Sequence, residues 1–276
     1  MATPFLLGFW SLTSQFSRKN RVPLSVVGVG WLSYGDGVIT IGPYRFSDAD
    51  AARTLGASDA LFDLLVDGLR PSAVDATASH RRRAQEAVDL AAGDPDTALG
   101  IWWDEWQSAM DAVRATGAFG PSEVGTATAL FRGRGGVPKE PVGSVEVDHA
   151  GVVDDRQANR SHHGSPWQAL CLWSTEAVDA LRIDGHPIAP GLAGENVSLT
   201  GLPWDRVRPG VRLRVGDVLA QVSAYAVPCA KNAGWFVDGR FDVMHHRHGP
   251  VSRVYATVVE PGSIIVGSPA LLEPSF

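Results

Sequence analysis

The sequence has 276 residues, of which 45% are hydrophobic and 20% are charged, and its formal net charge is −6. A chain of this length forms one large or two modest domains with room for a sizeable core. The acidic balance argues against a nucleic-acid-binding protein, which would normally carry a basic stripe.

Cysteine usage and the N-terminus bear on the compartment. The chain has only two cysteines, too few for a disulfide framework, and this favours a reduced compartment. Residues 1–12 are apolar but lack the basic start and the small-residue cleavage site of a secretory signal, and they are too short to span a bilayer. We therefore expect a cytoplasmic protein without membrane contact, with residues 1–12 packed on its body.

The first predicted elements form a β-hairpin. Residues 24–32 and 38–42 are two β-like runs, and Asp36-Gly37 between them is a hairpin turn signal. The glycines of residues 27–31 are not a nucleotide-binding loop, because a third glycine and a following helix are both missing.

Three helices are predicted next. The first starts with Ser58 as its cap and is stopped by Gly68 and Pro71; the others span about 77–92 and, after Pro95, 96–117. The third helix carries Trp102, Trp103 and Trp106 at helical spacing. These side chains are expected in the core or at an inter-domain contact, and substrate stacking is the alternative left open for Trp102 and Trp103.

The remainder predicts a barrel. Residues 118–137 are rich in Gly, Ser, Thr and Arg and are interpreted as a linker or mobile loop, so we place a domain boundary there, between residues 1–125 and 126–276. Alternating strands are expected at 142–147, 213–215, 218–225 and 252–259, with a return strand reaching 267 and a helix at 174–181. The fold class is α+β, a β-barrel with a few helices preceded by a mixed, mainly helical region.

Cys229 is the first candidate for chemistry. It follows the predicted strand that Pro228 ends, and Lys231 and Asn232 come directly after it. A nearby ammonium favours the thiolate, which attacks electrophiles and binds soft metals. The alternative is a small buried hydrophobe, which is what we expect of Cys171 in its apolar run.

Several motifs in fixed order accompany Cys229. They are residues 191–197, residues 201–204, residues 208–217 and finally Val-Pro-Cys-Ala-Lys at 227–231. Together they resemble a MOSC domain, the module at the C-terminus of molybdenum cofactor sulfurases and in stand-alone bacterial proteins. The resemblance starts near Gly136 and reaches Gly267. The first 120 or so residues do not resemble the β-rich domain that precedes some MOSC domains, and they are too short for a cysteine desulfurase domain.

The resemblance implies a set of site residues. Cys229 corresponds to the family's cysteine, which ligates molybdenum in some members and carries sulfur in others. The residues that the resemblance places around the same cofactor pocket are Asp155, Arg156, Arg160, His162, His163, Glu195, Asn196 and Lys231. Arginine and lysine suit a molybdopterin phosphate, and asparagine suits the pterin edge.

Each of these residues also has a purely structural interpretation. The pair His162-His163 fits a turn, since no second metal-binding pair supports a zinc site. Glu195-Asn196 fits a turn cap, and Arg156 fits a surface ion pair with Asp154 or Asp155.

The sequence departs from the family pattern at two places, and a histidine cluster follows Cys229. Asp154 stands where many relatives have glycine, and residues 164–168 read Gly-Ser-Pro-Trp-Gln in place of Gly-Gly-Pro-Asp-Arg. The added negative charge and the missing arginine would weaken an anion pocket. Among the imidazoles of residues 244–250, His245 is the expected proton donor, with a solvated loop as the alternative.

The leading functional hypothesis is a molybdenum-cofactor enzyme that reduces N-hydroxylated or N-oxide small molecules, with Cys229 as the metal ligand and a separate electron donor. The first alternative is a molybdenum-free sulfur-transfer or carbon–sulfur bond enzyme, in which Cys229 is the nucleophile or persulfide carrier and a sulfur donor is the partner. The second alternative is a non-catalytic carrier module that docks a partner through the tryptophan-bearing region.

Overall fold

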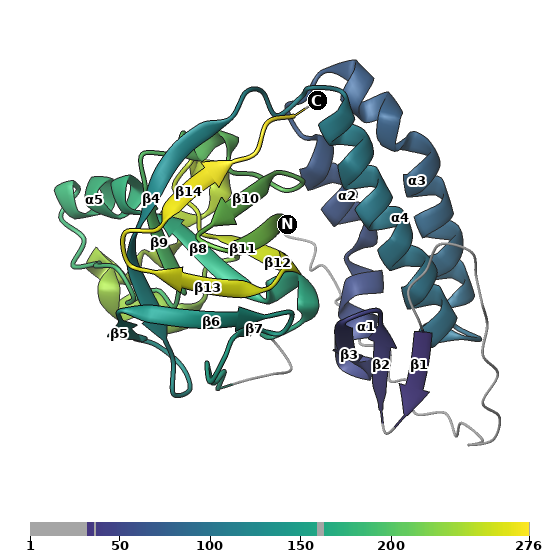
Figure 1. Cartoon of the computed structure of the whole chain (residues 1–276), viewed down its shortest axis with the longest axis horizontal. Coiled ribbons are helices and arrows are strands. Elements are labelled where there is room, and N and C mark those ends of the chain that lie inside the picture. Colours follow the sequence, from purple (N-terminus) through teal and green to yellow (C-terminus); the bar gives the residue numbers. More distant parts are fainter. Residues whose placement is uncertain (1–31, 36, 159–162, 276) are drawn as a thin grey trace, which may run out of the picture.

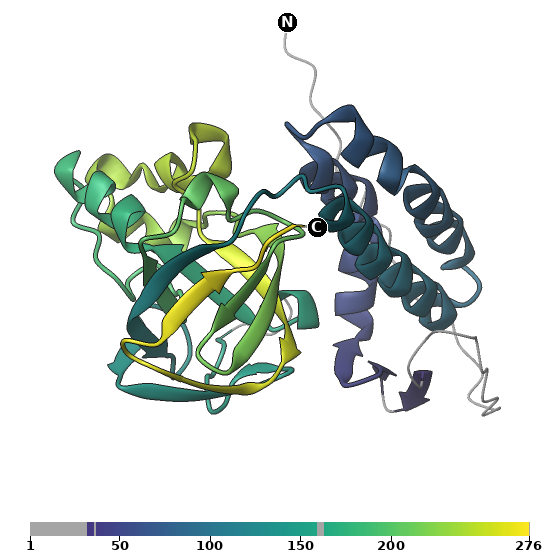
Figure 2. The same cartoon turned by 45° about the horizontal axis from the view of Figure 1, so that its top comes forward.

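The computed structural model describes residues 32–35, 37–158 and 163–275. A β-barrel and a region of long helices lie side by side, as Figures 1 and 2 show from two directions. The α+β class and the C-terminal barrel predicted from the sequence are confirmed. The glycine-rich run at 27–31 and the first predicted strand lie almost wholly outside the described residues.

A small antiparallel sheet opens the described chain. It consists of β1 (Leu32–Gly35), β2 (Val38–Ile41) and β3 (Tyr44–Ser47). The turn after β1 contains Gly37, whose φ of 73° lies in the left-handed region that glycine adopts without strain. The predicted hairpin is therefore present, although the described part of its first strand begins at Leu32.

Four helices follow: α1 (Asp48–Gly56), α2 (Ser58–Val66), α3 (Pro71–Leu90) and α4 (Pro95–Ala115). Helix α1 was not predicted, although Ser47 and Asp50 form a capping box at its start. Pro71 begins α3, where it was expected only to stop the previous helix, because proline fits the first turn of a helix. None of the described helices combines the length and apolarity needed to cross a membrane.

The tryptophans of α4 belong to the core. Trp102, Trp103 and Trp106 are only 1%, 4% and 1% exposed. Trp102 stacks on Trp106 at 5.7 Å between ring centroids, and Phe62 of α2 meets Trp106 edge-on at 5.2 Å. Trp102 also donates its indole N–H to the Ser58 hydroxyl at 2.7 Å, so Ser58 packs inside the bundle and caps nothing.

Seven of the described strands close into a barrel. Their order around the ring is β14 (Pro269–Leu272), β10 (Arg212–Val215), β11 (Val218–Tyr225), β12 (Val254–Glu260), β8 (Leu170–Ser174), β9 (Val197–Thr200) and β4 (Glu123–Arg132), which pairs again with β14. Neighbours are antiparallel except for β8 and β9. Three-residue β5 (Glu140–Val142) extends the sheet beyond β4, and β13 (Gly262–Ile265), β6 (Ser144–Asp148) and β7 (Gly151–Val152) form a separate sheet. Helix α5 (Thr175–Ile183) follows β8.

Strand β4 overturns the predicted linker at 118–137. The strand occupies Glu123–Arg132, and Ala127 and Leu130 on it are 0% and 1% exposed. Its residues are mainly small, so its hydrophobic alternation is weak and its composition resembles that of a loop. Small residues are needed here because Gly125 passes so close to β9 that an added Cβ would overlap the carbonyl oxygen of Thr200.

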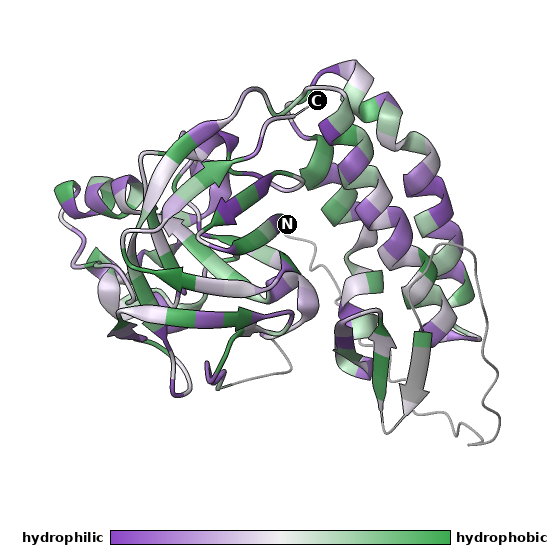
Figure 3. Ribbon diagram, in the orientation of Figure 1, coloured by the Kyte–Doolittle hydropathy of each residue, from purple (hydrophilic) through white to green (hydrophobic). Residues whose placement is uncertain are grey.

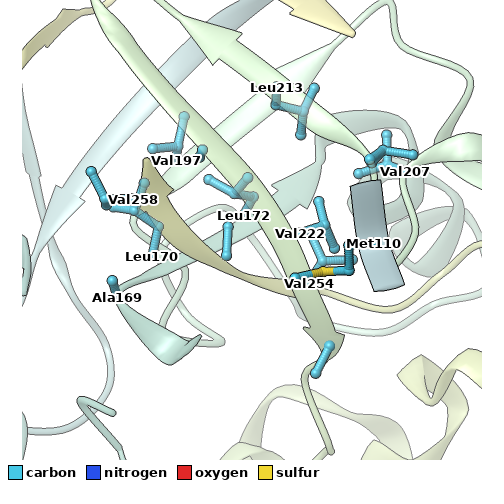
Figure 4. Close-up of a cluster of buried hydrophobic side chains, with 14 of the residues drawn as sticks. Met110, Ala169, Leu170, Leu172, Val197, Val207, Leu213, Val222, Val254 and Val258 are labelled. Carbon is cyan, nitrogen blue, oxygen red and sulfur yellow. The ribbon is translucent and has the colours of Figure 1, made fainter. Parts of the chain in front are cut away.

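The barrel core is continuous with the helical region. Figure 4 shows Leu172, Leu213, Val222 and Val254 from four barrel strands gathered with Met110 of α4, and all of them belong to one cluster of buried side chains. Hydrophobic and hydrophilic residues alternate along α3 and α4 in Figure 3, as expected of helices with one face packed.

Polar contacts add to this packing. The Arg208 guanidinium donates to the carbonyl oxygens of Leu64 and Leu65 at 3.0 and 3.1 Å, and the Tyr44 hydroxyl donates to the carbonyl oxygen of Val258 at 2.8 Å. The helical region and the barrel therefore share both apolar and hydrogen-bonded contacts.

Gly125→Ala should lower the free energy of unfolding by about 1–3 kcal/mol, because the new Cβ must push apart β4 and β9. That Cβ would also lie 2.8 Å from Cγ of Leu202. Urea unfolding followed by tryptophan fluorescence measures the loss. Gly143→Ala is the matched control: no atom lies within 4 Å of its added Cβ, and it should change stability by less than about 0.5 kcal/mol. Equal effects of the two changes would contradict this account of β4.

Candidate functional site

Cys229 lies just past the end of β11 and precedes a short 3-10 turn, Ala230–Trp235. The thiol is half-buried, and its Sγ donates to Oδ1 of Asn232 at 3.5 Å. Asn232 is 1% exposed, and its Nδ2 donates to the carbonyl oxygen of Ala193 at 3.4 Å. The segment that carries the thiol is therefore fastened to the loop before β9.

Arg253 also donates to the carbonyl oxygen of Ala193, from the segment just before β12. It directly precedes β12, is 6% exposed, and donates from Nη1 to the oxygen of Ala193. Its Nε is buried without a hydrogen-bond partner. Arg253 is not among the site residues predicted from the sequence. The available signal was a lone arginine at the start of an otherwise apolar β-run, a setting in which a charged side chain needs a specific reason to be buried.

Strand registers place these residues at one end of the barrel. Tyr225, at the end of β11, pairs with Val254 at the start of β12, and Val254 pairs with Leu172 of β8. Leu172 in turn pairs with Val197, the first residue of β9. The Cys229 segment, Arg253 and the loop before β9 thus meet where these strands begin or end.

The acidic groups around Arg253 favour their neutral forms. Burial raises the pKa of the Glu195 carboxyl and of the Cys171 thiol, and it raises the pKa of Tyr255 to about 12. Burial alone would lower the pKa of Arg253, but the neighbouring acidic groups, Cys229 among them, raise it above its usual value. The raised pKa of Arg253 keeps the guanidinium charged, whereas burial disfavours the charged forms of the acids near it.

Glu195 is fully buried and only half satisfied. Its Oε1 accepts the backbone N–H of Gly191 at 2.6 Å, which closes the turn before β9. Its Oε2 has no hydrogen-bond partner. The turn-cap interpretation fits Oε1, and Oε2 is left as a polar atom facing the same buried environment.

Asp155 and Asn196 form a structural network. Asp155 accepts from Nζ of Lys139 at 2.7 Å and from Nδ2 of Asn196 at 3.0 Å through Oδ2, and from the backbone N–H of Gly133 at 2.5 Å through Oδ1. The side chains of the Lys139–Asp155 ion pair are 10% and 5% exposed. Asn196 also accepts the backbone N–H of Cys171 at 3.1 Å. The structure brings these two predicted residues together, and their polar atoms are engaged within the fold.

The other predicted residues are placed apart. Arg156 is exposed, with its backbone N–H bonded to the carbonyl oxygen of Gly133 at 2.8 Å, and Lys231 is exposed beside Cys229. His163 is half-buried, whereas Arg160 and His162 lie outside the described residues. Their roles as ligands stay predictions.

The alternative surface ion pairs of Arg156 are wrong. Asp155 pairs with Lys139, and Asp154 lies 3.9 Å from Arg132. Asp154 has a φ of 64°, in the left-handed region where glycine is preferred and aspartate is tolerated. The Asp154 side chain is 81% exposed.

His245 lies in a different environment. It is 8% exposed, so its imidazole is not part of a solvated loop, and its Nδ1 accepts the backbone N–H of Arg247 at 3.2 Å. Burial, followed by the charge of Arg247, lowers its pKa, which favours the neutral imidazole. Its ring lies 4.3 Å from that of His246, which stacks on Tyr225 at 4.6 Å. The hydrogen bonds and ring contacts of His245 among the described residues do not include Cys229, and the role of His245 as proton donor stays a prediction.

Two surface hollows lie elsewhere. One, of about 690 Å³, follows the end of α5 and is lined by His186 and Ile183 among others; the second, of about 200 Å³, is lined by Trp204, Tyr225 and His246 among others. Cys229 lines neither. Within the described ranges, no three His, Cys, Asp or Glu side chains converge as a metal cluster would.

Comparison with known proteins gives a family match and two relatives. Residues 159–270 match the MOSC domain model. The chain is 30% identical over 135 residues to YiiM of Escherichia coli K12, covering 46% of this chain and 58% of that protein. It is 30% identical over 103 residues to YflK of Bacillus subtilis 168, covering 37% of this chain and 47% of that protein. The chain thus spans about half the length of the curated relatives it matches.

Two solved structures are also similar. YiiM from Geobacillus stearothermophilus shares 25% identity, with a TM-score of 0.43, over 55% of this chain and 75% of that one. The YuaD protein from Bacillus subtilis shares 16% identity, with a TM-score of 0.46, over 54% of this chain and 96% of that one.

Lys139→Met should lower the free energy of unfolding by about 3 kcal/mol, because it leaves the buried Asp155 carboxylate without its cation. Arg134→Met is the control, since the Arg134–Glu140 pair is 86% and 61% exposed and should contribute less than about 1 kcal/mol. Chemical denaturation of both variants measures the difference. A loss no larger in Lys139→Met than in the control would contradict the structural role of Asp155.

Glu195→Gln should change how stability depends on pH. Because burial raises the carboxyl pKa in the folded chain, that chain keeps a proton which the unfolded chain loses above its ordinary pKa of about 4.3. Wild-type stability from this group is complete at lower pH and falls as pH rises towards the folded pKa. Urea unfolding at several pH values should therefore show the variant gaining on the wild type as pH rises. The exposed change Glu140→Gln should follow the wild type, and parallel curves for Glu195→Gln and wild type would overturn the assignment.

Proposed function

We propose that the protein is a MOSC protein, on the match of residues 159–270 to the MOSC domain model, and that it binds the molybdenum cofactor through Cys229 and reduces N-hydroxylated or N-oxide small molecules. The observation that carries the proposal is the half-buried Cys229 thiol, which is held by Asn232 at one end of the barrel beside the buried guanidinium of Arg253. The free state of both cysteines supports a reducing, cytoplasmic setting as part of the proposal.

The donor chemistry of the site fits such a cofactor. A thiolate is a soft ligand, and one protein ligand is enough for a metal already held by the cofactor's own dithiolene sulfurs. When bound, the cofactor supplies a centre that accepts and donates electron pairs. Lys231 and Arg156, both exposed, are the side chains we assign to its anionic groups, whereas Asp155 and Asn196 hold the surrounding loop.

The proposed reaction is a two-electron reduction. An N-hydroxylated substrate takes up two electrons and two protons, its N–O bond breaks, and the amine and water are released. An N-oxide follows the same balance. The electrons come from a separate redox protein, and His245, in the segment between β11 and β12, is the titratable group that we expect to take part in proton transfer.

Sulfur transfer is the second candidate. It is favoured by the engagement of Asp155 and Asn196 inside the fold, which removes two of the side chains expected to hold a cofactor. In this version the outer sulfur of a persulfide donor passes to the Cys229 thiolate, and the donor leaves as its thiolate. Docking through the tryptophans of α4, the basis of the carrier-module alternative, has lost its motivation because those side chains are buried.

Cys229→Ala should abolish metal retention. Wild type from a cofactor-competent host should carry near-stoichiometric molybdenum and pterin, and Cys229→Ala should lose molybdenum by at least about tenfold, since even supporting residues of metal sites change affinity by that factor. Elemental analysis and the fluorescence of oxidised pterin are the measurements. Cys171→Ala is the matched control, because this cysteine is 6% exposed and lies in β8.

The outcomes separate the two candidates. Loss of molybdenum in Cys229→Ala but not in Cys171→Ala supports the cofactor proposal. Wild type free of metal and pterin contradicts it, and a persulfide on Cys229 detected by mass spectrometry after incubation with a sulfur donor would then support sulfur transfer.

A further inference from the structure

Arg253 is a buried cation without a carboxylate partner. Among the ion pairs of the described residues none includes Arg253, although its side chain is only 6% exposed. Its described hydrogen bond goes to one neutral acceptor, the carbonyl oxygen of Ala193, and its Nε has no partner. A buried charge without a counter-ion is costly, so the guanidinium calls for an anion that the chain itself does not provide.

The acids nearest to Arg253 do not fill this role. Glu195, Cys171 and Tyr255 interact with it electrostatically, but burial raises the pKa of each and favours the neutral form. Cys229 is the remaining acidic neighbour, and its side chain is only half-buried. The unbalanced positive charge therefore lies beside the one thiol that solvent and ligands reach.

A shared backbone acceptor links Arg253 to the Cys229 segment. Arg253 and Asn232, the hydrogen-bond partner of Cys229, share the carbonyl oxygen of Ala193. The next residue is Gly194, with a φ of 92°, and an added Cβ there would lie 3.9 Å from Nη1 of Arg253. The same Cβ would lie 2.8 Å from Cγ1 of Val137, so glycine is required where the loop passes between Val137 and the guanidinium.

We propose that Arg253 binds an anionic oxygen of the ligand that occupies the Cys229 site. The planar guanidinium offers parallel N–H donors to a phosphate or a carboxylate, and an unfilled donor such as Nε completes such a pair. The inference rests on the proposed function in placing a ligand at Cys229, and it names the residue that recognises that ligand's charge. It requires no metal.

The test uses the full chain purified from a host that cannot make the molybdenum cofactor. The rate of Cys229 alkylation by iodoacetamide is followed by peptide mass spectrometry at increasing concentrations of inorganic phosphate or of acetate, at constant ionic strength. Cys171 is buried, so its labelling reports unfolding. The variants are Arg253→Gln, Arg253→Lys and the control Arg208→Gln.

Arg208 is a control matched for hydrogen-bond chemistry, and its side chain is partly buried. Its guanidinium also donates to backbone carbonyl oxygens, those of Leu64 and Leu65, and its Nε is also buried without a partner. Its electrostatic neighbours are Tyr225 and Asp67, and Cys229 is not among them.

The anion should slow Cys229 alkylation saturably in wild type and in Arg208→Gln. Arg253→Gln should require an anion concentration at least roughly tenfold higher for the same protection, since a hydrogen bond to a charged group is lost. Stronger protection by phosphate identifies a phosphate-bearing ligand, and stronger protection by acetate a carboxylate-bearing one. If Arg253→Gln does not fold, Arg253→Lys decides, because it keeps the charge and loses the fork. No protection of wild type, or equal protection of wild type and the folded Arg253 variants, overturns the proposal.

This test stands apart from the molybdenum measurement. Anion protection that depends on Arg253 in a protein that never loads molybdenum would keep the inference and reject the cofactor proposal. Molybdenum loading without anion protection would do the reverse.

Discussion

Strand β4 closes the barrel, because it pairs with β9 along one edge and with β14 along the other. Closure removes the free edges of the sheet and fixes where every strand ends. The last residues of β4, the turn before β9 and the start of β8 meet at Asn196, whose carbonyl oxygen accepts the N–H of Phe131 and whose backbone N–H donates to the oxygen of Cys171. The position of the Cys229 site follows from this closure, since the β11–β12 and β12–β8 registers carry it to the same end.

Two buried cations near this end, Lys139 and Arg253, differ in whether a carboxylate neutralises them. Lys139 is neutralised by Asp155, which is itself held by Asn196 and the N–H of Gly133, so this part of the network is complete. Arg253 has one carbonyl acceptor and acidic neighbours that favour their protonated forms. A complete network stabilises a loop, whereas an incomplete one beside a half-buried thiol is a place where a ligand supplies the missing partner. This contrast is the reason why we treat Lys139 and Asp155 as structural and propose a ligand for Arg253.

The sequence predicted the barrel and the position of Cys229 after a strand, and it showed the MOSC resemblance, since each depends on local periodicity or on motif order. It missed β4, whose small residues resemble a linker although two of them are fully or nearly fully buried. It did not predict the hydrogen bonds of Asp155 with Lys139 and of Asn196 with Cys171, because these partners lie 16 and 25 residues away in the sequence and no local pattern indicates them. Arg253 was missed for a related reason. Whether an arginine just before a strand is paired depends on residues from other segments, which only the folded chain brings together.

We propose Cys229 as the protein's own sulfur ligand to molybdenum, and X-ray absorption at the molybdenum edge of the loaded protein tests this proposal most directly. Wild type should show one sulfur neighbour more than Cys229→Ser protein loaded with the same cofactor, with an oxygen neighbour gained in its place. The Cys171→Ala protein should match the wild type, since its thiol is buried in β8. Identical sulfur coordination in wild type and Cys229→Ser would contradict the account and leave Cys229 to chemistry without the metal.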